Sequence, residues 1–335
     1  MANEAGRNSV RILPVSSRFP DLAALTTGLA ALWHDKGTAG GQVRIRRRKP
    51  NVYASTFPSE VVTCRLGGGD ERKLFCKYGR GPGHSDQGCR GGVCYEAEVY
   101  QRVLRSLPLP VPVFHGFLAD ASAGGPALVL DYLEDSLRIS RAPDEGAMSQ
   151  AAAWAGRFHA LQQERLRHNV PSFLARYDAD YFAGWSRRLL LCAKARLPRS
   201  PWLRTVCRGY EERIPLLTEP PLTVIHGEFT PHNVLWCDGQ VVPTDWEAAA
   251  VGAGAIDLAT LIEGWKEETL CACEKSYRQA RWPEGAPRSF AETFGAARLY
   301  VAFRWLAVCP EWTVGNGSTP DLNGLHDRAE RMGLI

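Results

Sequence analysis

Two polar residues, Asn233 and Asp245, flank a stretch of sequence that has the pattern of a β-hairpin. In "NVLWCDGQVVPTDW" two short apolar runs are joined by Asp238-Gly239, a dipeptide typical of two-residue hairpin turns. The pairing set by this turn places Asn233 opposite Thr244 and diagonal to Asp245. An amide oxygen and a carboxylate therefore converge at the open end of the hairpin. Magnesium-nucleotide chemistry requires such hard oxygen ligands, because the ion bridges phosphate oxygens while the protein supplies few ligands.

Taken alone, Asn233 or Asp245 could simply cap the hairpin. The spacing of the residues upstream favours a catalytic or metal-binding role instead. The segment "HGEFTPHNVL" places His226, Glu228 and Asn233 in order, and Asp245 follows. A signature of protein kinases has a histidine, one residue, an aspartate, four residues and an asparagine, with a metal-binding aspartate further on. One position departs from this signature, since Glu228 stands where the signature carries aspartate.

Two charged residues far upstream occur in the order that a kinase requires. Lys77 lies near the end of the apolar run "KLFCKY", and Glu96 lies near the start of the helical pattern "VCYEAEVYQRVL". Kinases use a strand lysine to hold nucleotide phosphates and a helix glutamate to position that lysine. Glu98 competes with Glu96 for this role. We favour Glu96 because its helical face is apolar, whereas Glu98 shares its face with arginines.

The elements that must position these residues fall into two parts. An amphipathic helix is expected over 21–35, and the first part then continues with short strands, a glycine-rich loop, a helix and a buried strand. The strands are expected at 51–55, 60–66 and 73–78 as an antiparallel meander, the mobile loop at 79–92 and the buried strand at 126–133. From residue 145 onward the pattern is mostly helical, except over 222–247. The sequence predicts an N-terminal lobe over 1–130, in which 1–45 is an unassigned helical extension, and a C-terminal lobe over 131–335.

Composition narrows the classes of function. The chain has 335 residues and a formal net charge of only +4, part of which comes from the run "RIRRRK" at 44–49, so no broad nucleic-acid surface is expected. No apolar run is long enough to span a membrane, and the first residues lack the pattern of a secretory signal. The ten cysteines show no paired metal-ligand spacing, which favours free thiols. We expect a cytoplasmic protein that binds neither nucleic acid nor a membrane.

These segments together resemble the aminoglycoside phosphotransferase and choline kinase family, whose members are small-molecule kinases. "VIHGEFTPHNVL" resembles the catalytic loop of that family, "PTDWEAAAVGAGAIDLA" its metal-binding segment, and "CYEAEVYQRVL" with "LPVPVF" its first-lobe helix and exit. The similarity runs from about residue 50 to 307. The resemblance implies a two-lobed, protein-kinase-like α+β fold, with a small antiparallel sheet in the N-terminal lobe and a larger, mostly helical C-terminal lobe.

The resemblance also implies roles for the residues of the C-terminal lobe. Asn233 and Asp245 would bind Mg²⁺, and Glu247 would supply a further carboxylate close to the metal. Glu228 would be the base that receives the proton of the acceptor hydroxyl. Asp257 would accept hydrogen bonds from the backbone of the catalytic loop, although a carboxylate at a helix N-terminus would have the same sequence pattern.

The two histidines His159 and His226 are expected to have structural roles. His159 lies between apolar neighbours in a helical pattern, which favours a satisfied core histidine. His226 would hold the catalytic loop in place and transfer no proton.

For the nucleotide, the resemblance implies contacts in the N-terminal lobe and in the linker that follows it. Lys77 would hold the α- and β-phosphates with Glu96 as its partner. Where many kinases carry glycines over the phosphates, this chain has "NVYASTFPSE", so Ser55, Thr56 and Ser59 would donate instead. The strand "LVLDYLED" would hold the adenine through the backbone of Asp131 and Leu133.

The implied function is the ATP- and magnesium-dependent transfer of a γ-phosphate to a hydroxyl group of a small molecule or a peptide. The alternative is a nucleotide-binding pseudokinase with a regulatory or scaffolding role, because Glu228 is longer than aspartate by one methylene, roughly 1.5 Å. A misplacement of ~1 Å can cost about a hundredfold in rate. Charge and basicity are kept, however, so we favour the enzyme. Basic residues prevail in "WSRRLLLCAKARLPRS", which favours a neutral or anionic acceptor over a polycation. The acceptor's identity and the oligomeric state are left open.

Overall fold

The computed structural model describes most of the chain. It describes residues 19–34, 42–51, 57–66, 69, 71–79, 91–119, 126–144, 146–194, 197–219, 221–308 and 322–335. The chain divides into two compact units. The first unit comprises Met1–Asp86, Gly91–Gln101 and Val113–Tyr132, and the second comprises Gln87–Arg90, Arg102–Pro112 and Leu133–Ile335.

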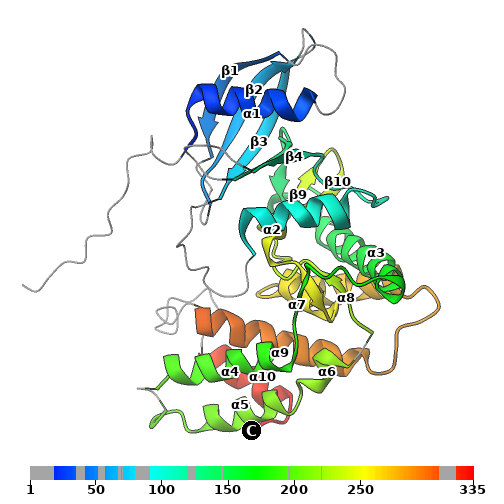
Figure 1. The fold of residues 1–335 in the computed structure, drawn as a ribbon. Helices are drawn as coiled ribbons and strands as arrows, with labels where there is room; N and C mark the ends of the chain where they lie inside the picture. Colours follow the sequence, from blue (N-terminus) through cyan, green and yellow to red (C-terminus); the bar gives the residue numbers. More distant parts are fainter. Residues whose placement is uncertain are drawn as a thin grey trace, which may run out of the picture. The chain divides into compact units, whose positions relative to one another are not determined.

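The first unit is built on an antiparallel sheet of five strands in the order β1-β2-β3-β5-β4 (Figure 1). The strands are β1 (Val43–Pro50), β2 (Ser59–Leu66), β3 (Glu71–Tyr78), β4 (Phe114–Leu118) and β5 (Ala127–Asp131). Helix α1 (Leu22–His34) buries Leu25, Leu29 and Trp33 in one core with apolar side chains of the sheet. The strands predicted at 60–66, 73–78 and 126–133 are confirmed as β2, β3 and β5, whereas β1 and β4 were not predicted.

The strand predicted at 51–55 lies outside the described residues, apart from Asn51. Strand β1 is formed by "VRIRRRKP", the basic run. Because β1 is an edge strand, its long charged side chains can reach solvent. Arg48 is an exception, since its Nη2 lies 2.6 Å from Oε1 of the buried Glu60. The predicted mobile loop lies almost wholly outside the described residues, because residues 80–90 are not among them.

Helix α2 (Gly92–Val99) carries Glu96 and continues into a single π-helical turn over Tyr100–Leu104. The α-helical hydrogen-bond pattern therefore ends earlier than the continuous apolar periodicity predicts. The buried residues of α2 include Val93, Glu96 and Val99, and the helix contacts β5 and β4. Glu96 is thus a carboxylate buried inside the first unit.

The second unit is mostly helical (Figure 1). Its helices are α3 (Ala147–His168), α4 (Ala179–Cys192), α5 (Trp202–Glu211), α6 (Pro215–Thr218), α7 (Ala255–Ile262), α8 (Glu267–Arg281), α9 (Phe290–Val308) and α10 (Leu322–Arg331). Helices α3 and α8 pack closely at Gly156, where a Cβ atom would lie only 2.6 Å from the carbonyl oxygen of Tyr277. Pro215 begins the short helix α6, where its fixed backbone angle suits the first helical position. Helix α8 was not predicted.

Short strands interrupt the helices of the second unit and hold the candidate catalytic segment. Strands β9 (Val234–Cys237) and β10 (Gln240–Pro243) form the predicted hairpin, extended by β6 (Leu137–Arg138). Its register confirms the predicted pairing, because the backbone N–H of Thr244 donates to the carbonyl of Asn233 at 2.8 Å. A second small sheet has the order β7-β11-β8, with β7 (Ala175–Arg176), β8 (Thr223–Ile225) and β11 (Ala250–Gly252).

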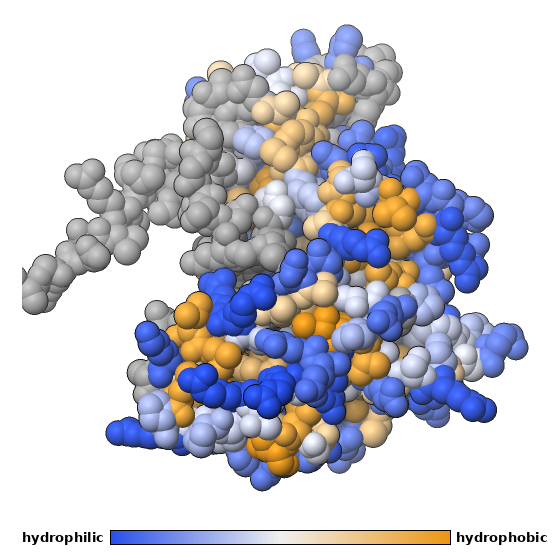
Figure 2. Space-filling model, turned by 60° about the horizontal axis from the view of Figure 1, so that its bottom comes forward, coloured by the Kyte–Doolittle hydropathy of each residue, from blue (hydrophilic) through white to orange (hydrophobic). Residues whose placement is uncertain are grey.

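Among the described helices, none is long and apolar enough to cross a membrane. On the face that Figure 2 shows, apolar patches are interspersed with hydrophilic side chains. Most of the large apolar side chains are instead buried, among them Trp154, Trp246, Phe158 and Phe229. These aromatic rings pack together beside the candidate catalytic segment described next.

Candidate active site

The segment 226–233, here called the catalytic loop, connects β8 to β9 in the second unit. Gly227 has φ +79°, and a Cβ atom there would lie 2.2 Å from the carbonyl oxygen of Ala248, so only glycine fits. Local hydrogen bonds tighten the loop, from Thr230 N to Glu228 O at 2.7 Å and from Asn233 N to Thr230 O at 3.0 Å. Part of the backbone geometry of the loop is thus determined by its own residues.

Asp257, at the start of α7, fixes the N-terminal end of the catalytic loop. Its carboxylate accepts the backbone N–H of His226 at 2.7 Å and that of Gly227 at 2.9 Å. The Nε2 of His159 lies 3.0 Å from the same carboxylate. Asp257 is 1% exposed, so these hydrogen bonds are shielded from water.

The side chain of His159 links Asp257 to α8. Its Nδ1 lies 2.9 Å from the hydroxyl of Tyr277, and its Nε2 faces Asp257. Burial lowers the pKa of His159, and the hydrogen bond to Asp257 only partly opposes this effect. A neutral imidazole that donates from Nε2 and accepts at Nδ1 satisfies both contacts. His159 is therefore a buried histidine whose hydrogen bonds are satisfied, and one of them supports Asp257.

His226 links the catalytic loop to the hairpin. Its Nε2 lies 2.9 Å from the carbonyl oxygen of Thr244, the residue just before Asp245. Its ring also packs against Trp246, with ring centroids 4.5 Å apart. These contacts hold two segments of the candidate site together through the backbone and an aromatic ring.

Oxygen ligands converge at the open end of the hairpin. The amide nitrogen of Asn233 donates to the carbonyl of Glu228 at 3.1 Å, which orients the amide group and reserves its oxygen for another partner. Asp245 adopts the left-handed conformation with φ 67°, and one of its carboxylate oxygens lies within 4.8 Å of a carboxylate oxygen of the buried Glu247. A strained non-glycine residue at this place is typical of a functional site. One amide oxygen and two carboxylates are the donor set that a hard divalent cation accepts.

In the first unit, Lys77 and Glu96 form a buried ion pair. The Nζ of Lys77 lies 2.7 Å from Oε2 of Glu96, and both side chains are at most one-tenth exposed. The ring of Phe57 lies 5.3 Å from the same Nζ. Glu98 is exposed and takes no part in this pair. The apolar face of α2 thus buries the glutamate that meets the lysine.

The remaining candidates for nucleotide contact have mixed outcomes. Ser55 and Thr56 lie outside the described residues, while Ser59 is buried and its hydroxyl accepts from the Asn51 amide at 3.1 Å. The backbone N–H of Asp131 donates to the carbonyl of Val113, and its side chain contacts His115. The carbonyl of Leu133 accepts the hydroxyl of Ser136 at 2.9 Å. For Ser59, Asp131 and Leu133, the contacts that the structure describes are with neighbouring residues of the chain.

Sequence reasoning missed Arg304 on α9. The guanidinium of Arg304 forms an ion pair with the carboxylate of Glu228 and donates to the carbonyl of Gly227 at 2.6 Å. The available signal was a single arginine within the apolar run "LYVAFRWLAV". A charge on such a buried helix face requires a partner, but the sequence does not say which one.

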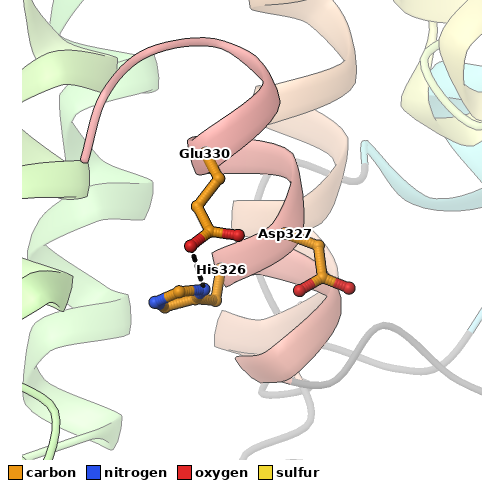
Figure 3. A group of neighbouring side chains, drawn as sticks. All are labelled: His326, Asp327 and Glu330. Carbon is orange, nitrogen blue, oxygen red and sulfur yellow. Dashed lines mark ion pairs between the residues drawn. The ribbon is translucent and has the colours of Figure 1, made fainter.

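A separate group of metal-capable side chains lies on α10. His326, Asp327 and Glu330 come from two adjacent turns of that helix, and Nδ1 of His326 lies 3.7 Å from a Glu330 carboxylate oxygen (Figure 3). This is an (i, i+4) ion pair of half-exposed to exposed residues, which is common on helix surfaces. It gives no reason to infer a second metal site.

Comparison with solved structures shows the fold. A choline kinase from Streptococcus pneumoniae matches with a TM-score of 0.54 at 13% identity, over 87% of this chain and 95% of that chain. A macrolide 2'-phosphotransferase of type I matches with a TM-score of 0.55 at 18% identity, over 93% and 98%. A variant aminoglycoside 2'-phosphotransferase in a GDP complex matches with a TM-score of 0.59 at 13% identity, over 93% and 96%. The predicted two-lobed, protein-kinase-like α+β fold is confirmed by these matches.

Comparison with curated protein sequences gives no match. The model of the phosphotransferase enzyme family, in contrast, matches residues 61–307, which is most of the chain. That range includes the Lys77–Glu96 pair, the catalytic loop, the hairpin and Arg304. The chain belongs to the phosphotransferase enzyme family.

Proposed function

We propose that this protein transfers the γ-phosphate of ATP to a hydroxyl group of a small molecule, with Mg²⁺ as the metal. The observation that carries the proposal is the catalytic loop. One buried carboxylate, Asp257, fixes its N-terminal end, and the amide of Asn233 at its other end is hydrogen-bonded to the carbonyl of Glu228. Phosphoryl transfer depends chiefly on positioning and electrostatics, so a pre-organised loop is the feature that such an enzyme needs.

The donor set at the hairpin fits Mg²⁺. We assign the amide oxygen of Asn233 and the carboxylate of Asp245 as ligands, with Glu247 as a further carboxylate beside them. When bound, the ion would neutralise charge on the phosphate oxygens. The left-handed backbone of Asp245 is the support from this chain, since such strain is kept where a side chain must be aimed at a fixed point.

The nucleotide contacts are assigned to the first unit and to Leu133, the residue that follows its last segment. Lys77 would hold the α- and β-phosphates, and its buried ion pair with Glu96 would fix its position. We keep Ser55 and Thr56 as hydrogen-bond donors to phosphate, and the backbone of Asp131 and Leu133 as the adenine contact. ATP is the proposed donor, but two of the matching aminoglycoside phosphotransferase structures are GDP complexes, so GTP must be tested beside it.

Glu228 is assigned as the base that receives the proton of the acceptor hydroxyl. Removal of this proton as the oxygen attacks the γ-phosphate avoids a positively charged intermediate oxygen. A carboxylate is needed for this step, and glutamate supplies one at a longer reach than aspartate.

The charges around Glu228 favour a neutral or anionic acceptor. A cationic acceptor gains most when it meets an uncompensated carboxylate, but the charge of Glu228 is already balanced by Arg304. The matching structures include choline kinases and an aminoglycoside phosphotransferase, names that indicate cationic substrates for those proteins. We propose a hydroxylated metabolite or a peptide hydroxyl of a cytoplasmic pool for this protein.

A nucleotide-binding pseudokinase is the second candidate function. The observation that favours it is the ion pair of Glu228 with Arg304, since this contact occupies one of the two carboxylate oxygens that a base could use. The two candidates share nucleotide binding and differ only in turnover.

The test combines binding with turnover. Thermal unfolding at millimolar ATP or GTP with Mg²⁺ should show a concentration-dependent rise in melting temperature. Slow magnesium-dependent ATP hydrolysis should be measurable in the wild type and absent in Asp245→Ala. No thermal shift with either nucleotide would reject both candidates, whereas binding without turnover would favour the pseudokinase.

A further inference from the structure

Arg304 contacts two consecutive residues of the catalytic loop at once. Its Nη1 donates to the carbonyl of Gly227 at 2.6 Å, and its Nη2 donates to Oε1 of Glu228. The planar guanidinium fixes the angle between its donors, so binding a backbone oxygen and a side-chain oxygen together restricts the rotamers of Glu228. The ion pair links residues 76 positions apart in the sequence, and both side chains are less than one-fifth exposed.

Aromatic residues lie near the guanidinium of Arg304. The hydroxyls of Tyr181 and Tyr300 lie 2.7 Å apart, and the rings of Tyr177 and Tyr181 stack with centroids 3.8 Å apart. The Cζ of Arg304 lies 6.0 Å from the ring centroid of Trp185. Burial opposes the charge of Arg304, but Tyr300 and Glu228 outweigh it and raise the pKa of the guanidinium. Arg304 therefore stays charged next to the loop.

The extra methylene of Glu228 poses a problem that this contact solves. A longer side chain has one more rotatable bond, so an untethered glutamate would sample positions beyond hydrogen-bond reach of the acceptor. A tether through Oε1 removes that freedom. Proton transfer uses a single carboxylate oxygen, so an ion pair at Oε1 is compatible with a base role for Oε2.

We propose that Arg304 is a positioning residue that adapts the catalytic loop to glutamate in place of aspartate. This inference rests on the proposed function of Glu228 as the base. It predicts that Arg304 contributes to turnover only through Glu228. A purely structural role, in which Arg304 ties α9 to the backbone of the loop, would instead act whether or not the glutamate is present.

A double-mutant cycle separates the two roles. Arg304→Met should lower kcat for magnesium-dependent ATP turnover about 10- to 100-fold, while KM for ATP changes less than about threefold. In the background of Glu228→Ala, the same substitution should change kcat by less than about threefold. Arg304→Lys should recover part of the lost activity, because it keeps the charge but lacks the planar fork.

Arg188→Met is the matched control. The guanidinium of Arg188 lies 5.8 Å from the same Trp185 ring, but Arg188 is on the exposed face of α4 and has no contact with Glu228 among those described. Its loss should leave kcat unchanged. Equal losses of activity on substituting Arg304 in both Glu228 backgrounds, or no loss in either, would overturn the inference.

A stability cycle distinguishes this failure from failure of the proposed function. Urea unfolding of wild type, Arg304→Met, Glu228→Gln and the double variant needs no turnover. We expect Arg304→Met to lower the unfolding midpoint clearly in the wild-type background and much less beside Glu228→Gln. Coupling without ATP turnover would reject the enzyme and keep the tether. Turnover without coupling in either cycle would reject the tether and keep the enzyme.

Discussion

Replacing Asp257 with asparagine perturbs the catalytic loop without changing the size of the side chain. The carboxylate accepts two backbone N–H groups and faces Nε2 of His159. Asparagine keeps one acceptor oxygen, and its NH₂ group replaces the other. If the remaining oxygen takes the place that serves His226 and His159, the N–H of Gly227 meets a donor instead of an acceptor.

The loss of unfolding free energy in Asp257→Asn can be estimated from these contacts. A hydrogen bond to a charged group contributes about 1.5–3 kcal/mol, and a buried donor left without an acceptor costs about 1–3 kcal/mol. Because Asp257 is almost fully buried, water cannot replace the lost acceptor. We therefore expect Asp257→Asn to lower the unfolding free energy by about 3 kcal/mol. For a unit of this size, about 2–4 °C per kcal/mol implies a fall in melting temperature of roughly 6–12 °C.

The assay is urea and thermal unfolding of the purified variant, followed by ATP turnover well below its melting temperature. Turnover should fall about a hundredfold, since a displacement of ~1 Å in the loop is enough for that loss. Asp327→Asn, on the exposed surface of α10, is the control and should change stability by at most about 0.5 kcal/mol. Wild-type stability and turnover in Asp257→Asn would refute the view that this carboxylate fixes the loop.

Three further predictions concern the base, a buried histidine and the lysine. Glu228→Ala should lower turnover by about a hundredfold with little change in nucleotide affinity, and Glu228→Asp should also lose activity because its carboxylate falls short; higher turnover in Glu228→Asp than in wild type would contradict this. Burial lowers the pKa of His159 in the folded state, so the unfolded chain binds more protons below about pH 6.5. The stabilisation that comes from neutral His159 is present above that pH and is lost as pH falls. Urea titrations at several pH values should show that the unfolding free energy of His159→Gln depends less steeply on pH than that of wild type. An equally steep dependence in the two proteins would exclude His159 as the source of the pH dependence. Lys77→Met should weaken ATP binding about tenfold or more, as measured by calorimetry. Lys73 is exposed on the same strand, so the control Lys73→Met should bind ATP as wild type does. Equal affinities in the two variants would contradict the assignment of Lys77.

Local signals in the sequence predicted the parts of the site that depend on local geometry. Asp238-Gly239 determines the turn, and the turn determines the register that brings Asn233 to Thr244. The apolar face of α2 likewise predicted that Glu96, and not Glu98, would be buried. In these cases the relevant neighbours are a few residues away, so periodicity and turn chemistry are sufficient.

The parts that depend on distant contacts could not be predicted in this way. The strand formed by the basic run at 43–50 is stabilised by its pairing with β2 and by the Arg48–Glu60 ion pair, neither of which has a local signal. His159 meets Asp257 across 98 positions of sequence, and Arg304 meets Glu228 across 76. The packing of the helices determines which side chains distant in sequence come into contact. A single sequence shows only that a buried charge needs a partner.

We propose that the chain catalyses ATP-dependent phosphoryl transfer to a hydroxyl group. The most direct test incubates the protein with ATP, Mg²⁺ and a pool of cytoplasmic metabolites and follows the pool by mass spectrometry. We expect at least one neutral or anionic hydroxylated compound that gains the mass of one phosphate with wild type and does not gain it with Asp245→Ala. A pool that stays unchanged with a protein that binds ATP, or a gain that persists in Asp245→Ala, would contradict the proposed activity.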